Sequence, residues 1–205
     1  MVHLAKYNVD HDTINIHLND KPDWLKEINP LAKVPVLEVS SDSNTQFINE
    51  SSKINEFLIE TFSSADDQPV IEKSESNELE QLFMETIVNL WYQVVYYKAS
   101  DRTEELIEGF NQFTSKLDSH FLAGDKITLA DYNIWVSLDY FRDFDRTFTF
   151  KPWLEMMQLT HPMCFKGKLA DYVNRLILLP EINKVICPQA IMGNFFKSRS
   201  FDEGI

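Results

Sequence analysis

Residues 21–37 read KPDWLKEINPLAKVPVL, and residues 47–51 read FINES. Proline is tolerated in the first turn of a helix, because its missing N–H is unpaired there, so Pro22 predicts a short helix that Pro30 ends. Residues 34–39 then predict a strand with proline near its start, where a lost hydrogen-bond donor is tolerated. A helix followed by a strand is the first indication of the fold class.

The segments on either side extend this pattern. Residues 13–18 alternate between apolar and polar side chains, which predicts a partly exposed strand. Residues 42–44, Asp-Ser-Asn, predict a turn, and residues 47–48 predict the strand that returns from it. A helix is predicted to start at residues 50–51, with apolar positions at Ile54, Phe57, Leu58 and Phe62. The expected order is strand, helix, strand, strand, helix.

The rest of the chain has the spacing of helices. Residues 63–69, SSADDQP, are polar and end in proline, so we place a linker there. Thr128 and Asp131 resemble a capping box, in which the Thr hydroxyl and the Asp carboxylate satisfy backbone donors at a helix start. Further helices are predicted over residues 153–159, 168–178 and 180–185. The change in periodicity predicts two domains, the second of them all-α.

Composition excludes several classes of function. The chain has 205 residues, with 19 Lys and Arg against 32 Asp and Glu, for a net charge of -13. Nucleic acids and anionic membrane surfaces are therefore not expected partners. No apolar stretch approaches the roughly 18 to 20 residues that a bilayer crossing needs, and the N-terminus lacks a secretory signal. We expect a soluble, cytoplasmic protein without a membrane partner.

The cysteines favour neither a disulfide framework nor a metal site. Cys164 and Cys187 are the two cysteines of the chain, and free buried thiols are the simplest interpretation of both. His161 and Cys164 have an H-x-x-C spacing, but a zinc site needs about four protein ligands and no second cluster supplies them. No metal is predicted.

Several motifs together resemble one family. Residues 21–24 (KPDW), 29–37 (NPLAKVPVL) and 50–51 (ES) are similar to the cytosolic glutathione transferases, most closely the omega class. Residues 123–135 (AGDKITLADYNIW) resemble the signature helix of the family's all-α domain, and residues 196–204 (FKSRSFDEG) resemble omega-class tails. The resemblance covers nearly the whole chain.

The resemblance implies an α+β two-domain glutathione transferase fold. Residues 1–66 would form an incomplete, N-terminally truncated thioredoxin-like domain that binds glutathione, and residues 71–197 the all-α C-terminal domain. Residues 1–9 would be the end of the family's first helix, with Val2, Leu4 and Val9 on its apolar side. A homodimer is the expected assembly, as is usual in this family.

The glutathione-binding residues are carried over position by position. Val34 would precede a cis-proline, Pro35, and pair its backbone N–H and C=O with the cysteinyl part of glutathione. The Ser51 hydroxyl and the helix N–H groups would hold the γ-glutamyl carboxylate, while Glu50 attracts the ammonium. Lys21 would approach the glycyl side. Without the resemblance, Ser51 is a plain N-cap, Glu50 a favourable first-turn acid and Lys21 a solvated charge.

The acceptor pocket and the nucleophile complete what the resemblance implies. Tyr172 matches an aromatic residue of the acceptor pocket, with ordinary packing as its alternative role. Omega-class enzymes use a cysteine after their first strand, at a helix N-terminus that favours the thiolate. This chain has no such residue, and the strand and its Cys-Pro would lie upstream of Met1. Cys164 and Cys187, in the all-α domain, are not expected to replace it.

Two functions remain open. The first is an enzyme that uses glutathione as co-substrate for thiol transfer or dehydroascorbate reduction on small electrophilic or disulfide substrates, with the nucleophilic cysteine missing from this chain. In that reaction a cysteine thiolate attacks the substrate and glutathione resolves the mixed disulfide. The alternative is a non-catalytic glutathione-binding or dimerising scaffold. Turnover with glutathione would distinguish the two.

Overall fold

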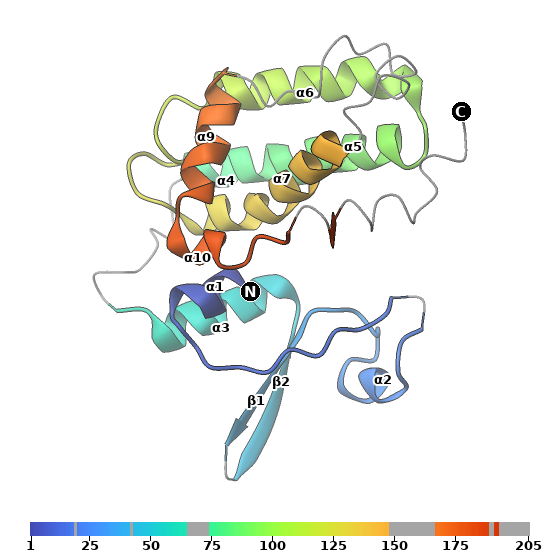
Figure 1. Cartoon of the computed structure of the whole chain (residues 1–205), viewed down its shortest axis with the longest axis vertical. Coiled ribbons are helices and arrows are strands. Elements are labelled where there is room, and N and C mark those ends of the chain that lie inside the picture. Colours follow the sequence, from blue (N-terminus) through green and yellow to red (C-terminus); the bar gives the residue numbers. More distant parts are fainter. Residues whose placement is uncertain (19, 42, 65–73, 148–166, 189–190, 193–205) are drawn as a thin grey trace. The chain divides into compact units, whose positions relative to one another are not determined.

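The computed structural model describes residues 1–18, 20–41, 43–64, 74–147, 167–188 and 191–192 (Figure 1). The chain separates into two compact units, Met1–Gln68 and Pro69–Ile205, and each is described by itself. The N-terminal unit contains helices and a hairpin, and the described elements of the second unit are all helical. The predicted fold class, a thioredoxin-like α+β unit followed by an all-α unit, is confirmed.

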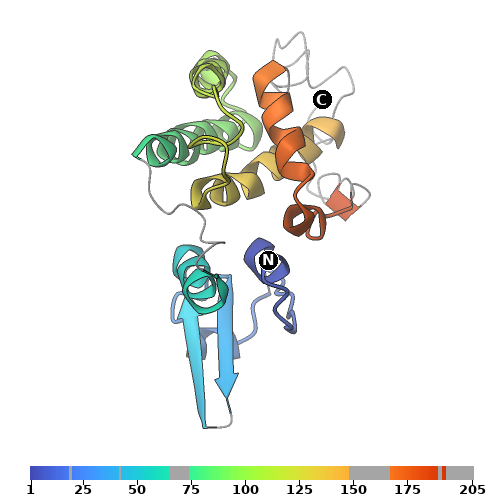
Figure 2. The same cartoon turned by 90° about the vertical axis from the view of Figure 1, so that its left-hand side faces the viewer.

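The N-terminal unit is built around an antiparallel hairpin. Its elements are α1 (Val2–Lys6), α2 (Trp24–Ile28), β1 (Val36–Ser41), β2 (Asn44–Asn49) and α3 (Ser51–Phe62). Figure 2 shows the two strands of this hairpin side by side. Val36 pairs with Asn49 at one end of the hairpin and Ser41 with Asn44 at the other. Helix α3 contacts both strands and α1. The buried apolar side chains of these helices include Val2, Leu4, Leu25, Leu58 and Ile59.

The predicted strand over residues 13–18 is wrong. These residues form no strand, and the side chains of Ile14 and Leu18 are 72% and 55% exposed. An alternating sequence becomes a strand only where a neighbouring strand supplies hydrogen bonds, and in the described residues the sheet consists of β1 and β2. The observed order is helix, helix, strand, strand, helix. Helix α1 covers Val2–Lys6 and buries Val2 and Leu4, whereas Val9 lies outside it.

The second unit packs its helices around aromatic side chains. Its elements are α4 (Ser74–Gln81), η1 (Leu82–Ile87), α5 (Val88–Val95), η2 (Ser100–Arg102), α6 (Thr103–Ser115), α7 (Leu129–Thr147), α9 (Gly167–Ile177) and α10 (Pro180–Asn183). Trp91 is fully buried and stacks on Phe141, with ring centroids 4.4 Å apart. Gly109 lets α6 approach η1, because a Cβ there would lie 3.2 Å from the Ile87 side chain. The helix predicted over residues 153–159 lies outside the described residues.

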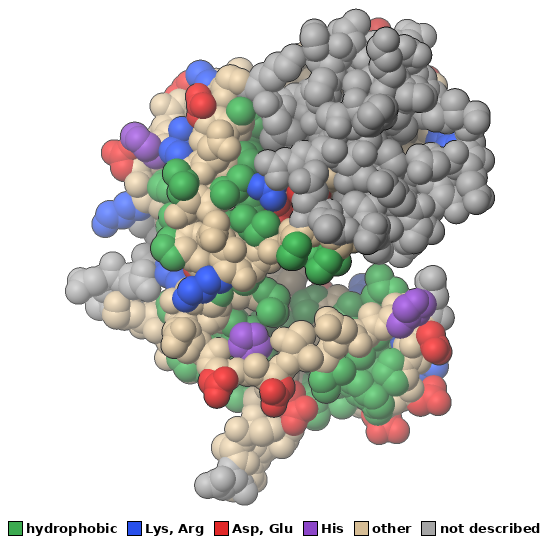
Figure 3. Space-filling model, in the orientation of Figure 1, with side chains coloured by type: hydrophobic (Ala, Val, Ile, Leu, Met, Phe, Trp, Pro, Cys, Tyr) green, Lys and Arg blue, Asp and Glu red, His purple; other side chains and the backbone are tan. Residues whose placement is uncertain are grey.

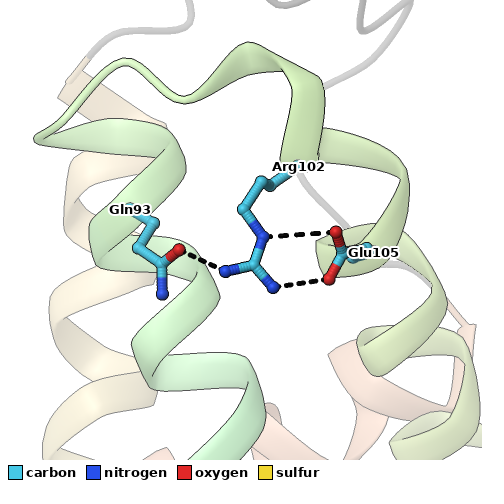
Figure 4. Close-up of polar contacts among 3 residues, drawn as sticks. All are labelled: Gln93, Arg102 and Glu105. Atoms are coloured by element: carbon cyan, nitrogen blue, oxygen red, sulfur yellow. Dashed lines mark hydrogen bonds and ion pairs between the residues drawn. The ribbon is translucent and has the colours of Figure 1, made fainter.

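Arg102 connects α5 to the start of α6 (Figure 4). Its Nε and Nη2 donate to Oε1 and Oε2 of Glu105 at 3.2 and 2.6 Å, a bidentate arrangement that suits the planar guanidinium. Its Nη1 donates to the side-chain oxygen of Gln93. The contact with Glu105 lowers the pKa of that carboxyl group, through the hydrogen bond first and the opposite charge second. Arg102 thereby holds the turn between these two helices.

Candidate functional site

The hairpin register brings two of the expected glutathione-binding segments to one end of the sheet. Val34 and Pro35 directly precede β1, and Glu50 and Ser51 directly follow β2. Because Val36 lies opposite Asn49 in an antiparallel pair, residues 34–35 and 50–51 flank the same end of the hairpin. The Val34–Pro35 peptide bond is cis. Val34 is 41% exposed, so this residue lies at the surface.

The start of α3 lacks a side-chain cap. Glu50 occupies the N-cap position with φ 73°, ψ 125°, and no side chain makes a cap hydrogen bond there. Ser51 is the first helical residue, so the structure does not place it as an N-cap. The first N–H groups of a helix have no intrahelical acceptor, and they favour an anionic partner. A positive φ at a non-glycine residue costs about 1 to 3 kcal/mol, and such strain is common at binding sites.

Lys21 and Asn29 fix the loop that leads to Val34. Lys21 Nζ donates to the backbone carbonyl of Ala32 at 2.9 Å, a contact that sequence analysis did not predict. Asn29 is 5% exposed, and its Nδ2 donates to the Lys33 carbonyl at 2.8 Å. The role of Asn29 was also missed, although the Asn-Pro pair that follows α2 signals a turn. Both side chains hold the backbone just before the expected site.

Apolar side chains gather on the surface over the α2 region (Figure 3). Trp24 of α2 is 41% exposed, and Leu31 in the following loop is 68% exposed. Val34, after the same loop, is 41% exposed.

Tyr172 lies in the core of the helical unit. Its side chain on α9 is 0% exposed, and its hydroxyl donates to Oδ1 of Asp131 at 2.7 Å. Asp131 also accepts from the backbone N–H groups of Leu122 at 3.0 Å and Thr128 at 2.8 Å. The Asp131 half of the capping box is thus confirmed, whereas the Thr128 hydroxyl donates to the carboxylate instead of accepting from backbone. The acceptor-pocket role of Tyr172 stays a prediction.

The burial of Tyr172 predicts a loss of stability at alkaline pH. Burial first, and then the charge of Asp131, raise the pKa of Tyr172 well above its ordinary value. The folded state therefore holds this proton more tightly than the unfolded state, so the stabilising effect is complete below about pH 10 and is lost as the pH rises further. Urea unfolding across this range should give a steeper decline for the wild type than for Tyr172→Phe. Equal slopes for the two proteins would contradict the prediction.

Cys187 does not have the environment of an activated thiol. It lies partly buried after α10, and burial first, followed by the charges of Asp143 and Asp139, raises its pKa. A nucleophilic cysteine needs the opposite shift. Cys164 lies outside the described residues. Within the described part of the chain, no cluster of His, Cys, Asp and Glu could hold a metal ion, and every helix is too short or too polar to span a bilayer.

Comparison with known proteins identifies both halves of the chain. Residues 2–61 match the family described as glutathione S-transferase, N-terminal domain, and residues 83–175 match glutathione S-transferase, C-terminal domain. Glutathione S-transferase omega-1 of Rattus norvegicus is 31% identical over 77% of this chain and 70% of the relative. Pyrimidodiazepine synthase of Drosophila melanogaster is 27% identical over 77% of this chain.

The structural comparison agrees with the sequence comparison. The crystal structure of glutathione transferase Omega 1C from Trametes versicolor covers 97% of this chain, with a TM-score of 0.76 and 19% identity, and 89% of that protein is matched. At this identity the likeness concerns the fold. The match to this chain spans 60% of the length of the Drosophila relative.

Proposed function

Since the chain belongs to the omega class of the glutathione S-transferase family, we propose that its N-terminal unit binds glutathione through Lys21, Val34, Pro35, Glu50 and Ser51. The observation that carries this proposal is the hairpin register, which has residues 34–35 and 50–51 at one end of the sheet. The uncapped start of α3 at the same end supports it, because its N–H groups suit a carboxylate.

Each part of the tripeptide has a matching group in this proposal. The backbone of Val34, a residue that is 41% exposed, pairs with the cysteinyl part, as one strand pairs with another. The Ser51 hydroxyl and the first N–H groups of α3 hold the γ-glutamyl carboxylate, and Glu50 attracts the ammonium. Lys21 approaches the glycyl carboxylate while its contact with Ala32 fixes the loop.

The proposed reaction is glutathione-dependent thiol transfer or dehydroascorbate reduction, by a cytoplasmic homodimer. Small electrophilic or disulfide molecules are the proposed substrates, with Tyr172 assigned to their pocket. We assign no nucleophile among the residues that the structure describes. Residues 1–68 contain no cysteine, and the pKa of Cys187 is raised. The raised pKa of Cys187 favours the second candidate, a glutathione-binding or dimerising scaffold without turnover.

Titration calorimetry with reduced glutathione, followed by turnover assays, tests these two candidates in sequence. We expect saturable binding at one site per chain. Reduction of a small disulfide and of dehydroascorbate by glutathione is then compared with and without the protein. Acceleration of either reaction supports the enzyme, and binding without acceleration supports the scaffold. If glutathione does not bind, the enzyme and the glutathione-binding scaffold are both wrong, and only a dimerising scaffold remains, which the oligomeric state in solution tests.

A further inference from the structure

Strand β1 has a free edge, the side that faces away from β2. The strand covers Val36–Ser41 and pairs with β2, and among the residues that the structure describes no segment pairs with its other side. The tip of the hairpin extends away from the helices of its own unit (Figures 1 and 2). Backbone N–H and C=O groups along such an edge are a template for another extended chain, and β1 carries one charged side chain, Glu38, that could oppose this.

A second segment of the same unit has the pattern of a strand but forms none. Residues 13–18, TINIHL, alternate between polar and apolar side chains. Ile14, His17 and Leu18 are all exposed. Within one copy this segment and β1 do not pair, although both belong to the unit Met1–Gln68. The segment therefore presents apolar side chains and strand chemistry to the surroundings of the chain.

Strand β1 itself has one polar and one apolar face. Ser40 Oγ donates to Oε1 of Glu38 at 2.8 Å, so these two side chains lie on the same face, as residues two apart in a strand do. Leu37 and Val39 alternate with them and are partly buried. A strand that adds to the free edge has to place apolar side chains beside Leu37 and Val39, and polar ones beside Glu38 and Ser40.

Residues 13–18 meet this requirement on both faces in an antiparallel register. The pairs in this register are Leu18 with Leu37, Ile16 with Val39, His17 with Glu38, and Asn15 with Ser40. The first two pairs are apolar and share one face, and the last two are polar and share the other. An imidazole N–H donates to a carboxylate, and a carboxylate has about four acceptor positions, so Glu38 accepts from His17 as well as from Ser40. A shift by one residue would place Ile16 opposite Glu38.

We propose that residues 13–18 of one copy of this chain add as an antiparallel strand to the free edge of β1 in a second copy. The added strand supplies the backbone partners that the edge lacks, and strand addition of this kind is a general mode of association. The pairing of His17 with Glu38 favours a second copy of the chain over an unrelated apolar strand. None of the proposed glutathione-binding residues takes part, so the proposal goes beyond glutathione binding and does not depend on it.

Cross-linking between two single variants tests the proposed register. Asn15→Cys and Ser40→Cys are made in separate proteins, which are then mixed and gently oxidised, so that a disulfide between residues 15 and 40 must join two copies. Directly opposite residues in an antiparallel pair have Cα atoms about 4.5 to 5.5 Å apart, which lies within the range of about 4.4 to 6.8 Å that a disulfide spans. Mass spectrometry of the linked peptides distinguishes this disulfide from those of Cys164 and Cys187.

The matched control replaces the second protein with Ser41→Cys, because residue 41 points to the opposite face of β1. We expect the 15–40 disulfide to form with a yield at least about tenfold above that of the 15–41 disulfide. Equal yields overturn the proposal, and so does the absence of both disulfides. It is also overturned if a 15–40 disulfide forms only when both substitutions are in one chain, because the pairing is then internal.

A side-chain variant tests the apolar face separately. Leu18→Lys, added to the Asn15→Cys protein, places a charge opposite Leu37 and should lower the yield of the 15–40 disulfide at least about fivefold. The matched control is Leu31→Lys, the same change at another exposed leucine of this unit, which should leave the yield unchanged. Circular dichroism confirms that both variants fold. Equal yields in the two variants overturn the proposal. The assay needs no glutathione, so its result is independent of the proposed function.

Discussion

Asp131→Ala is expected to lower the free energy of unfolding of the helical unit by about 3 to 5 kcal/mol, because a buried polar network would lose its common acceptor. The Asp131 side chain is 0% exposed. Its carboxylate accepts from the Tyr172 hydroxyl, the Thr128 hydroxyl and the backbone N–H groups of Thr128 and Leu122. The substitution removes a helix cap and leaves buried hydrogen-bond donors on three segments without an acceptor.

The magnitude follows from the donors that remain. Losing a helix cap alone costs about 0.5 to 2 kcal/mol. A buried donor left without an acceptor costs about 1 to 3 kcal/mol, and hydrogen bonds to a charged group lie at the upper end of the range. Partial relaxation around the shortened side chain keeps the total below the sum of these contributions. The effect should therefore exceed that of an ordinary surface substitution several-fold.

Urea unfolding followed by tryptophan fluorescence measures this loss, since Trp91 and Trp135 are buried in the same unit. The matched control is Asp125→Ala, in the same signature segment, whose carboxylate is 88% exposed and contacts His120 at 2.9 Å. Exposed ion pairs contribute about 0 to 1 kcal/mol, so the control should remain close to the wild type. A similar small effect in both variants would show that the Asp131 network does not stabilise the unit.

The sequence predicts the elements of this protein better than the contacts between them. The hairpin and the start of α3 follow from local signals, a turn at residues 42–44 and a polar pair before an apolar helix face. Residues 13–18 have an equally clear strand pattern, yet they form no strand, because pairing depends on a neighbour that the pattern does not specify.

The side-chain roles show the same limit. Lys21 has the sequence signature of a solvated charge, and its contact with the Ala32 carbonyl depends on the path of a loop. The sequence predicts that Tyr172 is an aromatic residue on a helix. Its hydrogen bond to Asp131 connects two helices that are far apart in the chain. Local chemistry predicts where such residues lie on a helix or loop. Which partner they meet is fixed by tertiary packing, which a single sequence does not display.

Ser51→Ala is expected to weaken glutathione binding about 10- to 100-fold. Under the proposed function the Ser51 hydroxyl donates to the γ-glutamyl carboxylate, and a hydrogen bond to a charged group contributes about 1.5 to 3 kcal/mol. In the free protein Ser51 is exposed, and no side chain caps α3. The substitution therefore removes no cap and replaces serine with the best helix former, so stability should change by less than about 0.5 kcal/mol.

Ser52→Ala is the matched control, because Ser52 is the next residue of α3, is also exposed and undergoes the same chemical change. Calorimetric titration of both variants with reduced glutathione separates the contribution of one hydroxyl from any general effect on the helix start. Ser51→Thr keeps the hydroxyl and should recover most of the affinity. If Ser51→Ala and Ser52→Ala bind glutathione equally well, the γ-glutamyl carboxylate does not contact Ser51. The start of α3 would then act through its backbone N–H groups alone, whose attraction for an anion both variants retain.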